Sequence, residues 1–205
     1  AALARAAWNQ DAWNKTPQVA LQPPRAEGPI GGQAAAFPQN AIDGTDDDAL
    51  YQTVRYDVAS YRFQGPDGTY SVTLKFCEPH HGAAGKRVFG VKIQGKEVIQ
   101  RLDIFGEAGK NKALDYTFGG VEVKGGWLDI DFVKQVEFPS IAAIEIRGAG
   151  LSRKINCGGP KYKDYDADWP AAAPARGYLP ADDFYDDWAL HELGPDAGPA
   201  AAAIF

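Results

Sequence analysis

Residues 69–76 read TYSVTLKF, and this stretch decides the fold class. Its large apolar residues alternate with small or polar ones, so in an extended chain they all lie on one face. This period of two predicts a half-buried β-strand. The preceding residues 65–68 read GPDG and have the Pro–Asp–Gly chemistry of a tight turn. The chain therefore turns and enters a strand that covers one side of a core.

Further strands are predicted on the C-terminal side of this one. RVFGVKIQGKEVI, residues 87–99, indicates a hairpin whose turn is Gln94–Gly95. WLDIDFV at 127–133 alternates again, and IAAIEI at 141–146 is one more apolar strand. Many short strands separated by turns predict an all-β fold, an antiparallel β-sandwich. The side chains expected in its core are those of Val72, Leu74, Phe76, Val91, Ile93, Leu128, Ile130, Phe132, Ile144 and Ile146.

Composition excludes several classes of protein. The 205-residue chain carries a net charge of −6 and has no basic stripe, which argues against a nucleic-acid partner. No run of apolar residues is long enough to span a membrane. The chain contains no methionine, so we expect it to be a piece of a longer protein. Cys77 and Cys157 are too few for a disulfide framework, which leaves two buried thiols or a single bond between them.

Three regions differ in composition. Residues 1–40 are rich in Ala, Pro and Gln, and we expect a connector that begins with a short helix over 1–13. Residues 41–159 hold the predicted sandwich. Residues 160–205 form a loop and a helical C-terminal flank, in which 182–193 has apolar spacing and acidic first-turn residues typical of a helix. The predicted architecture is thus a sandwich with short helical flanks.

Four motifs of the central region give a resemblance to a known family. They are DDDALYQTVRY (46–56), DGTYSVTLKFCE (67–78), GKRVFGVKIQGKEVIQRLDIF (85–105) and LDIDFVKQVEFPSIAAIEI (128–146). In order and spacing they resemble a malectin domain over about half of the chain. The resemblance implies a jelly-roll-type β-sandwich that binds di- and oligosaccharides. Domains of this kind occur in an endoplasmic-reticulum lectin, in plant receptor kinases and as modules of bacterial glycoside hydrolases.

The resemblance also implies a binding cleft at one end of the sandwich. Tyr56 matches the aromatic residue that follows the LYQT motif, while His80 and His81 stand where the family has a Tyr–Phe pair. Glu137 is the acid nearest to the family's aspartate before the proline of the penultimate loop. A further tyrosine that the family places upstream of LYQT has no clear match before Asp46. These departures from the family pattern put the glucose-disaccharide preference of the animal malectins in doubt for this chain.

The residues themselves leave two interpretations of His80 and His81 open. They follow a strand end in FCEPHHG, residues 76–82, where an imidazole ring could contact a sugar or remain a solvated loop side chain. A zinc site needs more ligands than this, and the remaining histidine, His191, belongs to the C-terminal region. We therefore expect no metal at the pair and no catalytic role. Tyr51 and Tyr56 are five residues apart, so in a strand they face opposite sides and one is expected in the core. The resemblance implies that Tyr56 is the exposed one, and the alternative is that both are packing residues.

Charged residues nearby have equally simple interpretations. Arg55 is expected to pair with Asp57 rather than with an acidic sugar. The acidic run 43–48 could hold a structural calcium ion, although it lacks the spacing of a calcium-binding hand and a solvated turn is the simpler interpretation. No cofactor is otherwise expected. Three further acids give no pair suited to glycoside hydrolysis, and Asp103 is expected to make a turn hydrogen bond: Glu78, Asp103 and Glu107.

KINCGG, residues 154–159, lies in an unexpected place. In malectin-like domains such a stretch is the first strand and precedes LYQT, whereas here it follows the last predicted strand. We expect a circular permutation in which residues 153–157 pair with the sandwich from the C-terminal side. The loop that follows would then reach the binding end and supply aromatic rings. The candidates are Tyr162, Tyr165 and Trp169.

These observations predict a non-catalytic carbohydrate-binding module. Its partners are an oligosaccharide or polysaccharide and the other domains of its parent chain, with no nucleic acid and no membrane. The C-terminal composition resembles segments that follow the barrel of glycoside hydrolases, so the parent is expected to be an extracellular or periplasmic enzyme of that kind. The alternative is a structural spacer, a sandwich that orients its neighbours and binds no sugar.

Overall fold

The computed structural model describes residues 25–170, so the helices expected at 1–13 and 182–193 lie outside the described residues. The described residues contain two short helices, α2 (Asp48–Tyr51) and α3 (Ile104–Ala108). No helix within 25–170 has the length and apolar character needed to cross a bilayer. The strands are β1 (Gly28–Ala36), β2 (Thr53–Gln64), β3 (Gly68–Phe76), β4 (Val88–Ile93), β5 (Lys96–Leu102), β6 (Leu114–Val123), β7 (Trp127–Val136), β8 (Ser140–Ile141), β9 (Ala143–Gly148), β10 (Leu151–Asn156) and β11 (Asp166–Ala167).

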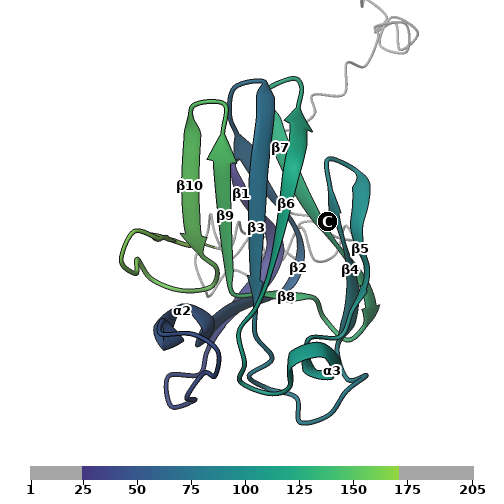
Figure 1. Ribbon diagram of the computed structural model, residues 1–205, viewed down its shortest axis with the longest axis vertical. Helices are drawn as coiled ribbons and strands as arrows, with labels where there is room; N and C mark the ends of the chain where they lie inside the picture. Colours follow the sequence, from purple (N-terminus) through teal and green to yellow (C-terminus); the bar gives the residue numbers. More distant parts are fainter. Residues whose placement is uncertain (1–24, 171–205) are drawn as a thin grey trace, which may run out of the picture.

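The strands form two sheets that face each other (Figure 1). One sheet has the order β1-β2-β7-β4-β5, with β8 added against β2. The other has the order β11-β10-β9-β3-β6. Every pair is antiparallel except the two-residue pairing of β10 with β11. The predicted all-β sandwich is therefore confirmed.

The core lies between the sheets and contains every side chain that the alternating pattern placed there. Residues 69–76 fall within β3, which is paired on both sides, with β6 and with β9. Its apolar face, together with that of β9, meets the apolar faces of β4 and β7 in the opposite sheet, and all ten residues expected in the core are buried. Burial of such side chains is the main force that holds the two sheets together. The hairpin turn is also as predicted, because Gln94 and Gly95 both have positive φ angles between β4 and β5.

β1 is a strand that the sequence did not predict. It lies within residues 1–40, which were assigned to a connector, and it pairs along β2 from Gly28 to Ala36. The sheet thus begins before residue 41, within the segment expected to be a connector. GPIGGQAAA lacks alternating large apolar residues, since an edge strand buries little of its surface.

KINCGG joins the sandwich as expected. Ile155 pairs with Ile144 in the antiparallel ladder of β10 with β9, and the Cys157 amide donates to the Ala142 carbonyl at 2.8 Å. The predicted ladder at this stretch is confirmed. A strand upstream of LYQT is also present, β1, but it belongs to the other sheet, whereas β10 pairs with β9. The circular permutation itself stays a prediction.

The segment that follows β10 closes one long side of the sandwich. Trp169 packs edge-on against Phe63 with ring centroids 5.9 Å apart, and it also contacts β1 at Gly28. Asp168 forms a buried ion pair with Arg55 of β2 at 2.6 Å. The expected pairing of Arg55 with Asp57 is therefore wrong. Asp57 has a φ of 57° at an irregular point of β2, where its amide bonds to the Pro139 carbonyl.

Within residues 25–170, no segment covers the opposite long side of the sandwich. β5 and β6 are the outer strands of their sheets there, and a cavity of about 570 Å³ lies between the β4–β5 hairpin and β6. Phe118 and Val121 of β6 and Val98 of β5 line it and are only partly buried. The C-terminal segment thus covers one long side, whereas on the other side partly buried side chains border a cavity.

Cys77 and Cys157 are both free and both buried, so the interpretation as two thiols holds. Burial raises the pKa of Cys77 to about 12, with a smaller contribution from the Glu78 carboxylate. Burial also raises the pKa of Cys157 well above its ordinary value. Both sulfur atoms therefore remain protonated and packed against the core.

Glu145 organises a charged network on the outer surface of the β3–β9–β10 sheet. Its carboxylate accepts a hydrogen bond from Tyr165 and faces Arg147 at 3.0 Å, Lys75 at 3.6 Å and Lys154 at 3.9 Å. Burial alone raises the pKa of Glu145, but the Tyr165 hydrogen bond and the cations outweigh it and the net shift is downward. A carboxyl with a lowered pKa in the folded state stabilises the fold while it is ionised.

The first prediction concerns Gly158, which has a φ of 72° and packs against the backbone of Val54. A Cβ at Gly158 would lie 2.2 Å from the Val54 carbonyl oxygen, whereas nothing lies within 4 Å of one at Gly125, which has a φ of 81°. Gly125→Ala should cost about 1–2 kcal/mol for the left-handed backbone alone. Gly158→Ala should cost about 1–3 kcal/mol more, because the clash adds to it. Urea unfolding of both variants measures the difference, and equal losses would contradict the close approach.

The second prediction concerns the pH dependence of stability. Glu145→Gln should lower the free energy of unfolding at pH 7, because only the ionised carboxylate bonds to the surrounding cations. Since its folded-state pKa lies below the ordinary glutamate value of 4.5, this stability is present above pH 4.5 and is lost as the pH falls through the folded-state pKa. Parent and variant should converge in strongly acidic urea titrations. A difference in the free energy of unfolding that persists at strongly acidic pH would show that the substitution acts through packing and not through the charge.

Candidate functional site

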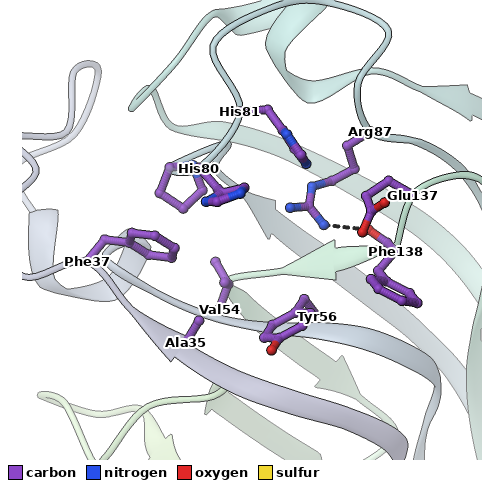
Figure 2. Close-up of a pocket in the computed structure, with 10 residues that line it drawn as sticks. Ala35, Phe37, Val54, Tyr56, His80, His81, Arg87, Glu137 and Phe138 are labelled. Carbon is purple, nitrogen blue, oxygen red and sulfur yellow. Dashed lines mark hydrogen bonds between the residues drawn. The ribbon is translucent and has the colours of Figure 1, made fainter.

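A pocket of about 280 Å³ opens at the end of the sandwich where the chain leaves β1, β3 and β7. Its lining comes from segments far apart in the sequence, which Figure 2 shows converging around one space. The lining is mainly apolar with a few polar groups, as is usual for a small-molecule site. The residues are Ala35, Phe37, Val54, Tyr56, Pro79, His80, His81, Arg87, Glu137 and Phe138.

Two ring pairs face each other across this pocket. Phe37 lies beside His80 with centroids 6.5 Å apart, and Tyr56 lies beside Phe138 with centroids 6.4 Å apart (Figure 2). The Tyr56 hydroxyl donates to the Gln33 side chain at 2.9 Å, which fixes the ring on the β1–β2 surface. Flat rings of this kind can pack against the C–H faces of a ligand, while the imidazoles and the phenol can bond to its polar groups.

A buried ion pair holds two walls of the pocket together. The Arg87 Nε atom donates to Glu78 Oε2 at 2.7 Å, and Glu78 is only 1% exposed. The other carboxylate oxygen accepts the backbone amides of His80 and His81 at 3.1 and 3.0 Å. Arg87 also donates to the Phe138 carbonyl at 2.5 Å, as the dashed line in Figure 2 shows. The His80–His81 turn and the Phe138 loop are thus fixed by the same pair.

His81 is held in its neutral form by its surroundings. Burial lowers its pKa, and the nearby charges of Arg87 and His80 act in the same direction, while Glu78 and Glu137 oppose them. Its Nε2 atom is buried and has no hydrogen-bond partner within residues 25–170. Its ring meets that of His80 at 4.8 Å in an edge-on arrangement. A proton on His81 would therefore add a poorly solvated charge beside Arg87.

The structure brings together four of the seven residues proposed from the sequence. Tyr56, His80, His81 and Glu137 all line the pocket. Tyr56 is partly exposed and Tyr51 is buried, as the resemblance implied; Tyr51 ends α2 rather than lying in β2, so the alternation of a strand is not the reason.

The three aromatic candidates from the C-terminal loop are not part of the pocket lining. Tyr162 donates to Asp47, and Tyr165 is buried and donates to Glu145. Trp169 packs on Phe63 beside the core. Their rings stabilise the closure of the sandwich, so the expectation that they reach the binding end is corrected.

Phe37, Arg87 and Phe138 belong to the pocket but were missed. Phe37 supplies an aromatic ring from upstream of LYQT, where the sequence offered no clear match. The Phe-Pro that follows Glu137 gave a usable signal, since it lies in the penultimate loop. Arg87 gave none, because its role depends on a contact with Glu78 across the fold.

The acidic residues considered for metal or catalysis are occupied by structural contacts. Asp47 pairs with Lys163, and Asp48 accepts the Ile42 amide at 3.1 Å. Asp103 caps α3 by accepting the Gly106 amide and also accepts that of Gly85, which is the expected turn bonding. Within residues 25–170, no three His, Cys, Asp or Glu side chains are grouped as metal ligands.

Known sequences give the first comparison. The chain is 32% identical to malectin of Homo sapiens over 117 residues, which cover 49% of this chain and 40% of that protein. Malectin-B of Xenopus laevis is also 32% identical over 117 residues, with 42% of its length covered. The chain thus spans about two fifths of the length of the curated relatives it matches.

Solved structures give the second comparison. A β-glucuronidase of Bacteroides uniformis matches 62% of this chain with a TM-score of 0.55 and 29% identity, over 15% of that chain. The plant receptor-like kinase FER matches 70% of this chain with a TM-score of 0.53, over 45% of that chain. At 16% identity the second match shows a shared fold alone.

The family comparison agrees with the pocket and with the motifs. The model of the malectin domain matches residues 6–147, which is well over half of the chain. The malectin domain is a non-catalytic carbohydrate-binding module. The match includes both aromatic pairs of the pocket and the Glu78–Arg87 pair that holds them. The chain therefore belongs to the malectin domain family.

Proposed function

We propose that this chain binds an oligosaccharide or polysaccharide in the pocket at the end of the sandwich and does not hydrolyse it. The observation that carries this proposal is the arrangement of Phe37, His80, Tyr56 and Phe138 as facing ring pairs around about 280 Å³ of space. A cavity of that size, near the lower limit for ligand pockets, accommodates a short stretch of a glycan. Glu137 and the imidazoles supply the polar contacts that hydroxyl groups require.

The pocket favours binding over a purely structural spacer. Its shape is fixed in advance by the Glu78–Arg87 pair, and a site with fixed walls loses little free energy to ordering when a ligand enters. The rings of the C-terminal loop, which could have filled the groove, are instead packed along the side of the sandwich. A spacer has no need of a preorganised, ring-lined cavity.

We also propose that the module serves a larger carbohydrate-active enzyme outside the cytoplasm, in an extracellular or periplasmic compartment. The similarity to one part of a bacterial β-glucuronidase supports a glycoside hydrolase as the parent. Hydrolysis by the present chain itself is not expected, so release of reducing sugar from any bound polysaccharide would overturn the non-catalytic assignment.

The third prediction tests the pocket directly. Tyr56→Ala and His81→Ala should each weaken retention in affinity gels about fivefold, since a lost aromatic contact costs on the order of 1 kcal/mol. The gels contain soluble starch, dextran, xylan or polygalacturonate, so that neutral and acidic polysaccharides are both tried. Tyr162→Ala is the matched control, because it removes a ring outside the pocket. If all three variants are retained as strongly as the parent, the binding site lies elsewhere on the protein.

The fourth prediction is a pH dependence of binding that originates in His81. The pKa of His81 is below 6.5 because of burial, so the neutral ring is present above that value. Retention should fall as the pH drops through this lowered pKa, since protonation places a charge beside Arg87. His81→Gln should bind with little change over the same range. A parent protein whose retention does not change from pH 7 to pH 4.5 would contradict it.

A further inference from the structure

We infer that Asp168 is a positioning residue for the sugar pocket and that it acts through Arg55. This inference rests on the proposed function and deepens it. It extends the binding unit beyond the family match, which ends at residue 147, to the segment Gly158–Trp169. The segment lines no part of the pocket, yet it fixes the wall that carries Tyr56.

Arg55 stands between two residues of the pocket wall. Val54 and Tyr56, its neighbours in β2, both line the cavity, whereas the Arg55 side chain is buried on the other side of the strand with 3% of its surface exposed. Its Nε atom donates to Asp168 at 2.6 Å, and its Nη2 atom donates to the Trp169 carbonyl at 2.7 Å. The guanidinium therefore anchors this part of β2 to the C-terminal segment.

The same guanidinium also holds β1. Its Nη1 atom donates to the Gly32 carbonyl at 3.2 Å, next to an irregularity in the β1–β2 ladder at Ile30 and Gly31. Regular pairing resumes at Gln33, which holds the Tyr56 hydroxyl, and continues to the pocket residue Ala35. Arg55 thus supplies a fixed contact where the backbone ladder is interrupted.

Asp168 is itself fixed on three sides. Its Oδ2 atom accepts the Gly158 amide at 2.5 Å and the Tyr61 hydroxyl at 2.9 Å, in addition to Arg55. The side chain is only 4% exposed. Gly158 in turn packs directly on the Val54 carbonyl. The C-terminal segment therefore contacts the β1–β2 wall both through the ion pair and through close backbone packing.

The fork of the guanidinium explains why arginine is required here. A lysine could keep the charge pair with Asp168, but a single ammonium on a flexible stem cannot reach Gly32, Asp168 and Trp169 in one fixed geometry. Arg55→Lys should therefore preserve most of the pairing and still loosen the wall. A role limited to charge balance would be fully rescued by lysine.

The experiment compares a neutral replacement of the pair with a second ion pair of the same segment. Both charges are removed together, as Arg55→Met with Asp168→Asn, because a buried charge left alone would unfold the protein. The asparagine keeps an acceptor for Gly158 and Tyr61. Asp47→Asn is the control, since it removes the exposed pair with Lys163 that also ties down this segment. Urea unfolding identifies the conditions in which all variants are folded.

Two measurements are then made on the folded proteins. Amide hydrogen exchange over residues 33–37 and 53–57 should become at least about tenfold faster in the double variant, reflecting local opening of the wall. Retention on whichever of the four polysaccharides binds the parent best should fall about fivefold or more, as expected when a supporting contact of a site is lost. Arg55→Lys should give intermediate values, and Asp47→Asn should match the parent in both.

The outcomes separate this inference from the proposed function. If no polysaccharide retards the parent, the proposed function fails, and the exchange rates still test the positioning. If the parent binds and the double variant shows the same retention and the same exchange, the positioning role is overturned. Full rescue of both measurements by Arg55→Lys would also overturn it.

Discussion

The ion pair between Arg55 and Asp168 is the contact on which most of this architecture depends. It joins residues 113 positions apart in the chain and removes both charges from water. The cost of that desolvation is offset by the bonds that Arg55 donates to Gly32 and Trp169 and by those that Asp168 accepts from Gly158 and Tyr61. Through it the first strand, the second strand and the last described segment form one unit. A sandwich that remained open on both long sides would expose much more of the core around Tyr61 and Phe63.

The position of the pocket is set by where the strands of the sandwich end. β1, β2, β3, β4 and β7 all contribute residues at or just beyond one end of the sandwich, where side chains are no longer needed to fill the core. Glu78 and Arg87 then fix two of the emerging loops against each other. Binding residues commonly lie on loops that a rigid scaffold positions. Here the loops are also fixed to each other, by the Glu78–Arg87 pair.

Local patterns predicted the sandwich well and the pocket in part. The alternation in β3, β7 and β9 is a property of neighbouring residues, so it was visible without any knowledge of the fold. Tyr56, His80, His81 and Glu137 were found through family motifs, whereas the parts played by Phe37 and Arg87 depend on contacts across the sheets that no local pattern encodes. The same limit explains the wrong partner assigned to Arg55 and the missed edge strand β1.

The two buried thiols have a practical consequence for chemical labelling. The chain contains no cysteines other than Cys77 and Cys157, and both are shielded from solvent and held protonated. A maleimide reagent should therefore not react with the folded protein, and it should react only when unfolding exposes the thiols. A cysteine introduced at an exposed loop position would carry a fluorophore selectively, without prior removal of the native thiols. The unmodified protein, in turn, reports its own unfolding through the rate at which these thiols become reactive.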